Sequence, residues 1–357
     1  MSTGPAEKPT VDVHAHILLP ALQQLVAEAD PEGFGAQQAL EVRRNGPESM
    51  AASGKMIKER WPQLTDLDRR LADMDAQGVD VQLVSPSPSH FYYFAAEELA
   101  LQVAKAANQA VREFVDRAPE RLNGLGLVPL QHPSLMVEAL EHAMLECGLL
   151  GVEIGSFAAT PTDPERSTVE LSDPRLEPFW SRAEELGALV FLHPFGCSLD
   201  ERLDRFYLAN TVSQPAENAV ALSHLIFSGV LDRHPDLRVL AAHGGGYLPT
   251  SLGRSDHAWR VRPEAHGCAQ PPSSYVKKLF FDSLVHSPAE LRALVAAAGP
   301  GQVLLGSDYP FDMGSDRPVA EVIEAQLSAE DEAWVLAGNA AALGITPASI
   351  LTARRTA

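Results

Sequence analysis

The sequence predicts an α/β fold of the (β/α)8 TIM-barrel type, with all 357 residues forming one domain. Two observations carry this prediction: eight short apolar, β-rich runs recur along the chain, and longer stretches with apolar residues at helical spacing separate them. The runs are nearly continuous in apolar residues, as expected for parallel strands covered by helices. A doubly wound open sheet is the alternative, but no GxGxxG motif follows the first run to support the dinucleotide site of such a sheet.

The predicted elements alternate regularly from one end of the chain to the other. The eight predicted strands are 10–17, 79–87, 122–130, 150–157, 188–195, 237–245, 278–284 and 302–310. The clearest helical patterns between them are 66–78, 98–118, 132–147 and 173–187, several of which end in Gly. Two connections, at about 18–64 and 196–215, are longer than a barrel needs, and we expect them to be insertion loops that cover a site or are disordered.

The composition is that of an ordinary globular protein with a strongly acidic balance. With 47 acidic against 28 basic residues, the formal charge of −19 disfavours nucleic acid and anionic membranes as partners. An anionic ligand therefore requires a local cluster of arginines. No apolar run approaches the ~18 residues of a membrane span, and the N-terminus lacks the pattern of a signal peptide, so we expect a cytoplasmic protein.

Residues able to bind a metal stand at the ends of several predicted strands. His14 and His16 lie on the first predicted strand, near its end, His193 lies near the end of the fifth, and Asp308 near the end of the eighth. Positions 14 and 16 point to the same side of a strand, and in a barrel the ends of the strands meet at one face. Each residue alone has an ordinary structural explanation, but together they predict a site for Zn²⁺, with Mn²⁺ as the alternative.

His243 ends the sixth predicted strand, in the segment AAHGGGYLP. The glycines that follow let the backbone approach a ligand closely. His243 is either a fifth metal ligand or a general acid/base, and we favour the second role because imidazole titrates near neutral pH.

Several longer motifs extend this pattern. They are DVHAHILLP, MDAQGVDVQLVS, VPLQ, HPF, AAHGGGYLPTSLGRSDHAWRVRP, PPSSYVKKLFFDS and GSDYPFDMG, and they span residue 11 to about residue 340. In these motifs the chain resembles the amidohydrolase superfamily, and within it the branch similar to aminocarboxymuconate-semialdehyde decarboxylase. The resemblance implies a metal-dependent barrel, mostly used to remove CO₂ from an unsaturated or aromatic acid.

The resemblance also implies roles for individual residues. It assigns His14, His16, His193 and Asp308 to the metal and makes His243 and Asp308 the predicted catalytic residues. Arg254 and Arg262 match arginines that bind the substrate carboxylate, which suits the bidentate geometry of guanidinium. One arginine of this pair reaches the neighbouring subunit in the family, which implies a homodimer, with Arg254 the favoured donor.

Three positions depart from the family pattern and affect the choice of substrate. A further family arginine aligns with Lys58 or, after a shift, with Arg60. Phe195 stands where the family has Trp, next to the substrate. Glu153 lies at the end of the fourth predicted strand, where it either repels a substrate carboxylate or pairs with a lysine.

These observations predict a metal-dependent, non-oxidative decarboxylase of a small unsaturated or aromatic acid, of the aminocarboxymuconate-semialdehyde or hydroxybenzoate type. The alternative is a hydrolase of a lactone, ester or amide on the same site, since a metal site of this kind also activates water. A third possibility, a metal-stabilised binding protein without turnover, predicts a closed coordination sphere.

Overall fold

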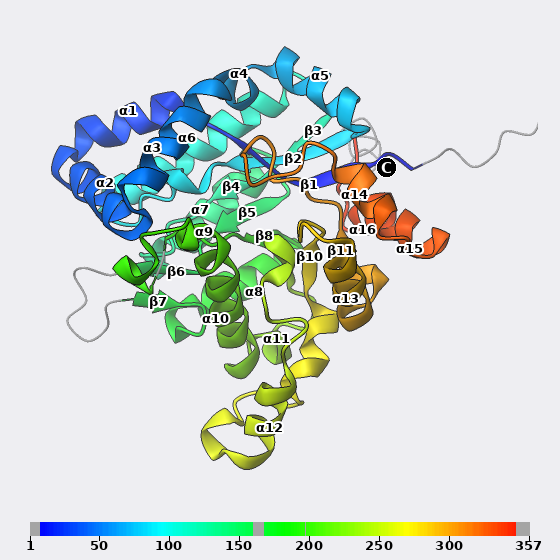
Figure 1. The fold of residues 1–357 in the computed structure, drawn as a ribbon. Helices are drawn as coiled ribbons and strands as arrows, with labels where there is room; N and C mark the ends of the chain where they lie inside the picture. The colour runs from blue at the N-terminus through cyan, green and yellow to red at the C-terminus, as the bar shows by residue number, and fades with distance from the viewer. Residues whose placement is uncertain (1–7, 160–167, 197, 348–357) are drawn as a thin grey trace, which may run out of the picture.

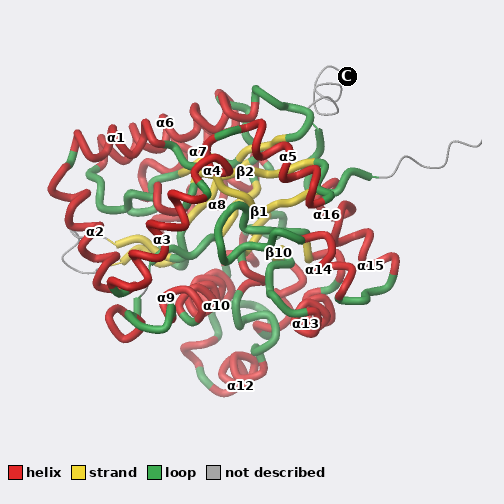
Figure 2. The backbone as a smooth tube through the Cα atoms, turned by 45° about the horizontal axis from the view of Figure 1, so that its top comes forward, coloured by secondary structure: helices red, strands yellow, loops and turns green. Residues whose placement is uncertain are grey.

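The protein is a closed barrel of parallel strands surrounded by helices (Figures 1 and 2). The computed structural model describes residues 8–159, 168–196 and 198–347. Every barrel strand lies within a run that the sequence predicts. In chain order the strands are β1 (Val11–Ile17), β2 (Val81–Pro86), β3 (Leu122–Gly124) continued by β4 (Gly126–Leu127), β5 (Gly151–Ile154), β8 (Leu189–Leu192), β9 (Arg238–Ala241), β10 (Phe280–Asp282) and β11 (Val303–Leu304).

Backbone hydrogen bonds close the ring of strands. The order β1-β2-β3 continues through β4 into β5, β8, β9, β10 and β11, and all these pairs are parallel. The last strand returns to the first, because the Val13 amide donates to the Leu305 carbonyl at 2.9 Å and Ala15 bridges to Tyr309. The ring is therefore a (β/α)8 barrel and not the doubly wound open sheet, which would leave two free edges.

A β-bulge in β1 places its histidines inside the barrel. Val11 and Val13 pack in the barrel interior with Leu83 and other strand residues, whereas Ala15 and Ile17 pack outward against the helices. The pairing with β2 shifts by one residue between positions 12 and 15, which turns the next inward positions from odd to even numbers. Along β1, valines therefore fill the barrel interior toward the amino end of the strand, and histidines point into it toward the carboxyl end.

Helices cover the outside of the barrel and follow the apolar pattern of the sequence. Asp66 caps the first predicted helix by accepting hydrogen bonds from the amides of residues 68 and 69, and Gly78 ends it in the left-handed conformation. The covering helices are α5 (Leu67–Gln77), α6 (Glu97–Val115), α7 (Met136–Glu141), α8 (Glu177–Leu186), α10 (Ser213–Phe227), α11 (Val230–Arg233), α13 (Pro288–Ala298), α14 (Pro318–Glu324), α15 (Ala329–Ala333) and α16 (Asn339–Ala342).

The long connection at 18–64 is helical and does not form the open loop that its length suggested. It contains α1 (Pro20–Ala29), α2 (Pro31–Asn45), α3 (Pro47–Glu59) and α4 (Trp61–Thr65), which gather on one side of the barrel in Figure 1. The second insertion contains α9 (Leu208–Thr211), and the two insertions meet where Arg43 pairs with Asp200 at 2.6 Å.

Two further elements extend from the barrel. The hairpin of β6 (Phe157–Ala159) and β7 (Thr168–Glu170) follows β5, and α12 (Gly253–Val261) projects at the opposite end of the molecule from α1 (Figure 1). Within the described ranges, none of the helices combines the length and the apolar composition needed to cross a bilayer.

Candidate metal and catalytic site

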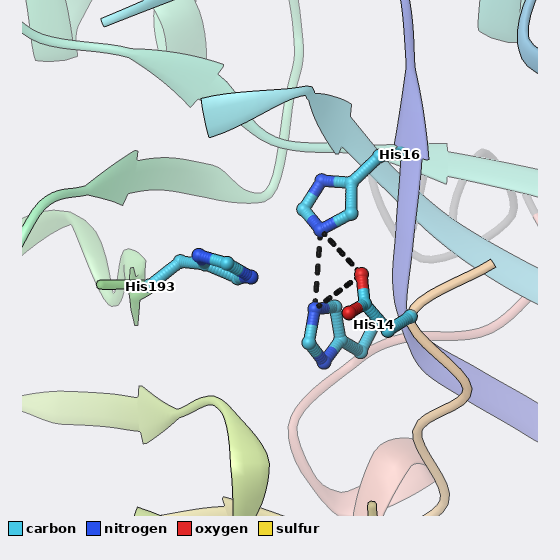
Figure 3. Close-up of side chains that lie close together, drawn as sticks. His14, His16 and His193 are labelled. Carbon is cyan, nitrogen blue, oxygen red and sulfur yellow. Dashed lines mark hydrogen bonds and ion pairs between the residues drawn. The ribbon is translucent and has the colours of Figure 1, made fainter. Parts of the chain in front are cut away.

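Four side chains converge at the carboxyl ends of the barrel strands. One ligand atom from each of His14, His16, His193 and Asp308 lies within 4.8 Å of the others. The Nε2 atoms of His14 and His16 are 3.1 Å apart, and Asp308 Oδ1 lies 3.4 Å and 3.3 Å from them. Figure 3 shows His193 pointing toward the two β1 imidazoles from across the barrel. The structure therefore brings together the four residues that the sequence predicts as metal ligands.

The donor atoms of this cluster fit a divalent cation. All four residues are buried, and His193 Nε2 and Asp308 Oδ1 have no hydrogen-bond partner among the residues that the structure describes. Buried polar atoms without a partner carry a desolvation cost that a bound ion removes. Three imidazole nitrogens and one carboxylate oxygen match the donor set of first-row divalent metals.

The charges of the cluster favour a cation as well. Burial opposes ionisation of Asp308, yet the charge of the adjacent His14, followed by close polar contacts with the imidazoles of His14, His16 and His243, holds the pKa of this carboxyl well below its ordinary value. Burial by itself lowers the pKa of His14, but Asp308 and Asp282 raise it to about 10. The two carboxylates thus favour protonation of both His14 nitrogens when no metal is bound, and a cation must displace the proton on Nε2.

The second ring nitrogen of each histidine has a fixed partner. His14 Nδ1 lies 2.6 Å from Asp282 Oδ2, His16 Nδ1 lies 3.1 Å from Ser85 Oγ, and His193 Nδ1 lies 2.9 Å from the Pro194 carbonyl. Partners at Nδ1 orient the rings and leave Nε2 free to bind a metal.

His243 faces the cluster without joining it. Its Nε2 atom lies 3.6 Å from Asp308 Oδ2, and its side chain is 18% exposed, unlike the buried ligands. It lines a pocket of about 530 Å³ together with residues of α9, α10 and α13. This placement at the boundary between the ligands and an open pocket favours the acid/base role over that of a fifth ligand.

Both His243 and Asp308 have a left-handed backbone, with φ of 54° and 56°. This conformation is unfavourable for residues with a side chain and is common where a fold fixes a functional group. The Asp308 amide donates to the His14 carbonyl at 2.8 Å, and the His243 amide donates to Asp282 Oδ2 at 2.9 Å. These bonds from other strands hold the two strained residues toward each other.

Two of the predicted substrate residues lie near the mouth of the barrel. Phe195 is partly buried and packs edge-to-face against Phe91, with ring centroids 6.2 Å apart. Arg60, between α3 and α4, donates to the Pro310 carbonyl at 2.8 Å, just after Asp308. Lys58 is exposed on α3. Of the two aligned cations, Arg60 is therefore the one in contact with the metal-ligand loop.

The two other predicted arginines are not brought to the cluster of their own chain. Arg254 is exposed on α12, and Arg262 ends this helix and pairs with Glu264. Neither residue lines the pocket beside His243. Neither arginine is therefore placed to contact a ligand in the pocket of its own chain.

Two further acidic residues, Glu153 and Asp282, are buried beside the metal-ligand histidines. Glu153 is fully buried, 4.0 Å from His16 Nδ1, and burial raises its pKa well above the ordinary value, so it does not act as a surface partner for lysine. Asp282, which the sequence analysis did not select, contacts both His14 and the His243 backbone. A charged residue at the end of an apolar strand, in LFFDS, is the signal that identifies it.

Comparisons with known proteins agree with this geometry. The pattern of the amidohydrolase family matches residues 11–343. The chain is 34% identical to 2-amino-3-carboxymuconate-6-semialdehyde decarboxylase of Dictyostelium discoideum, over 94% of this chain and 92% of that protein. It is 29% identical to γ-resorcylate decarboxylase of Rhodococcus jostii, over 77% of this chain and 88% of that protein.

A solved structure shares the fold. The dihydroxybenzoic acid decarboxylase of Polaromonas sp. JS666, solved with bound manganese and the inhibitor 2-nitroresorcinol, matches with a TM-score of 0.77 at 22% identity. The match covers 94% of this chain and 96% of that chain. The chain therefore belongs to the amidohydrolase family, in the branch that contains the aminocarboxymuconate-semialdehyde decarboxylases, as its motifs predicted.

Proposed function

We propose that this protein is a metal-dependent, non-oxidative decarboxylase of a small unsaturated or aromatic carboxylic acid. The observation that carries the proposal is the position of His243, which stands between a buried set of metal ligands and an open pocket. The relatives that are named as decarboxylases of 2-amino-3-carboxymuconate semialdehyde and γ-resorcylate support this reaction and these two substrate types.

Decarboxylation breaks a carbon–carbon bond and leaves the electron pair on the substrate carbon, which must then accept a proton. His243 is placed to supply that proton, because it reaches the pocket and its Nε2 is 3.6 Å from Asp308 Oδ2. Asp308, held ionised, stabilises the protonated imidazole before the transfer. A divalent ion, when bound by the four ligands, supplies Lewis-acid polarisation of a substrate oxygen.

The identity of the metal follows from the donor set only in part. We propose Zn²⁺ because three imidazoles and one carboxylate are a common zinc set. Mn²⁺ is the second candidate, because it occupies the related decarboxylase from Polaromonas. Elemental analysis of protein purified without added metal, followed by reloading of the stripped protein with each ion, distinguishes the two.

We further propose a homodimer in which Arg254 serves the partner's site. Its support is that Arg254 is exposed on α12, a helix that projects from the barrel (Figure 1), and that it does not line the pocket beside His243. Mixing the Arg254→Ala and His243→Ala variants should restore activity that neither has alone, because one site of the hybrid regains both groups. A fully active monomer in sedimentation experiments would contradict this arrangement.

The test of the reaction follows the products. Metal-loaded protein should release CO₂ from 2-amino-3-carboxymuconate semialdehyde or from 2,6-dihydroxybenzoate, and His243→Ala should not, while it still binds metal and unfolds cooperatively. Incorporation of solvent oxygen into a lactone, ester or amide product without CO₂ would instead identify a hydrolase and refute the proposal.

A further inference from the structure

Asp282 is a buried carboxylate at the end of β10 that receives hydrogen bonds from four donors. Oδ2 lies 2.6 Å from His14 Nδ1 and 2.9 Å from the His243 amide nitrogen. Oδ1 accepts from the Gly244 amide at 2.8 Å and from the Leu284 amide at 3.2 Å. One side chain therefore contacts both a proposed metal ligand and the backbone of the proposed acid/base residue.

Only a carboxylate satisfies this set of donors. The three backbone amides can only donate, and His14 Nδ1 must carry its proton for Nε2 to bind a metal. An asparagine of the same shape has one acceptor oxygen and one NH₂ group, so in either orientation it turns donors toward donors. If the asparagine turns its oxygen toward the Gly244 and Leu284 amides, its NH₂ group faces His14 Nδ1. His14 Nδ1 must then accept a hydrogen bond, which places the ring proton on Nε2.

The surroundings of Asp282 leave it little freedom to move. A Cβ atom built on Gly306, two residues after β11, would lie 2.7 Å from Asp282 Cβ and 3.0 Å from His14 Cβ. Because Gly306 has no side chain, its segment can lie close to both Asp282 and His14. A shift of His14 is therefore transmitted to the carboxylate rather than absorbed by empty space.

We propose that Asp282 is a positioning residue that couples metal binding by His14 to the placement of His243. The inference rests on the proposed function, in which His14 binds the ion and His243 moves the proton. The coupling passes through Oδ2, which His14 and the His243 amide share. Under this proposal an ion on His14 makes the His243–Gly244 backbone more rigid, and, because coupling between two sites is reciprocal, an ordered 243–244 segment strengthens metal binding. Loss of Asp282 weakens metal binding because His14 Nδ1 loses its partner.

The experiment compares wild type, Asp282→Asn and Ser85→Ala. Ser85 is the matched control, since it partners His16 Nδ1 but does not touch the His243 segment. We measure Zn²⁺ and Mn²⁺ affinity against a competing chelator, and amide hydrogen exchange of residues 243–244 with and without saturating metal. Both readouts are independent of decarboxylation, so an inactive wild type would refute the proposed reaction and leave the coupling testable.

The expected results separate the variants. Metal should slow exchange at residues 243–244 in wild type and in Ser85→Ala, but not in metal-saturated Asp282→Asn. Asp282→Asn should also bind metal about 10- to 100-fold more weakly than wild type. Wild-type affinity in Asp282→Asn, or metal-dependent protection that survives in it, would overturn the proposal. If Asp282→Asn does not fold, the wild type still tests the proposal. Amide exchange at residues 243–244 that does not change on metal saturation would overturn it.

Discussion

His90 offers a quantitative test of how the first insertion is attached to the barrel. It follows β2 and is buried, with 2% of its surface exposed. The Leu19 amide, at the start of α1, donates to His90 Nε2 at 3.0 Å, so the proton of the neutral ring is on Nδ1, which lies 3.1 Å from the Tyr92 hydroxyl. Protonation of Nε2 would break the bond to Leu19.

Acid should therefore destabilise the protein through His90. Burial lowers its pKa from 6.5 to about 4, so between these values the unfolded chain binds a proton that the folded chain does not. The stability contribution is complete above pH 6.5 and is lost as the pH falls toward 4. At one pKa unit per 1.36 kcal/mol, His90 removes about 2 kcal/mol of stability between pH 7 and pH 5.

The assay is urea unfolding of wild type and His90→Gln at pH 7 and pH 5. Glutamine does not titrate, and its amide oxygen can accept the Leu19 N–H, so the variant should lose about 2 kcal/mol less than wild type on acidification. His257→Gln, on the exposed side of α12, controls for removal of a histidine as such. Equal losses in wild type and His90→Gln would refute the reasoning.

Two further predictions concern the backbone and the entrance of the site. Gly246→Ala should destabilise the protein by about 3 kcal/mol in urea unfolding, because φ of Gly246 is 63° and the new Cβ would lie 2.2 Å from the Pro215 carbonyl oxygen. The control is Gly253→Ala, which should cost under 1 kcal/mol because no described atom beyond its chain neighbours and its own helix lies within 4 Å of its new Cβ. Arg60→Ala should raise KM for a carboxylate substrate about 10-fold, and Lys58→Ala should not, because only Arg60 contacts the loop after β11. Equal effects of these two substitutions would contradict the assignment.

The strand ends were predictable from sequence because their signal is local. His14 and His16 share a face through the two-residue period of a strand, and this relation holds in the structure. The bulge that turns this face inward was not predictable, since it depends on how β1 pairs with residues 81–86, far along the chain. Local pattern thus selects the ligands, and strand pairing decides where they point.

The insertion at 18–64 carries a local sequence signal for helices, namely recurring prolines. The segment 18–64 was expected to be a loop from its length, but its four helices begin with Pro20, Pro31, Pro47 and the pair Trp61–Pro62. Proline in the first turn is typical of helix starts, because its missing N–H has no partner there. The spacing of the prolines, and not the length of the segment, therefore indicates the structure of this insertion.

Placement of the acid/base pair depends on contacts that no local pattern contains. His243 and Asp308 follow different strands, β9 and β11, and each has a left-handed backbone that costs about 1–2 kcal/mol. The bonds that offset this cost come from His14 and Asp282, on two other strands. Substitution of Asp282 removes the side-chain acceptor of the His243 amide and therefore acts on the distance of 3.6 Å between His243 Nε2 and Asp308 Oδ2, even though it leaves both reacting groups in the sequence. For this reason the supporting residues, and not only the ligands, must be compared when the reaction of a relative is transferred to this chain.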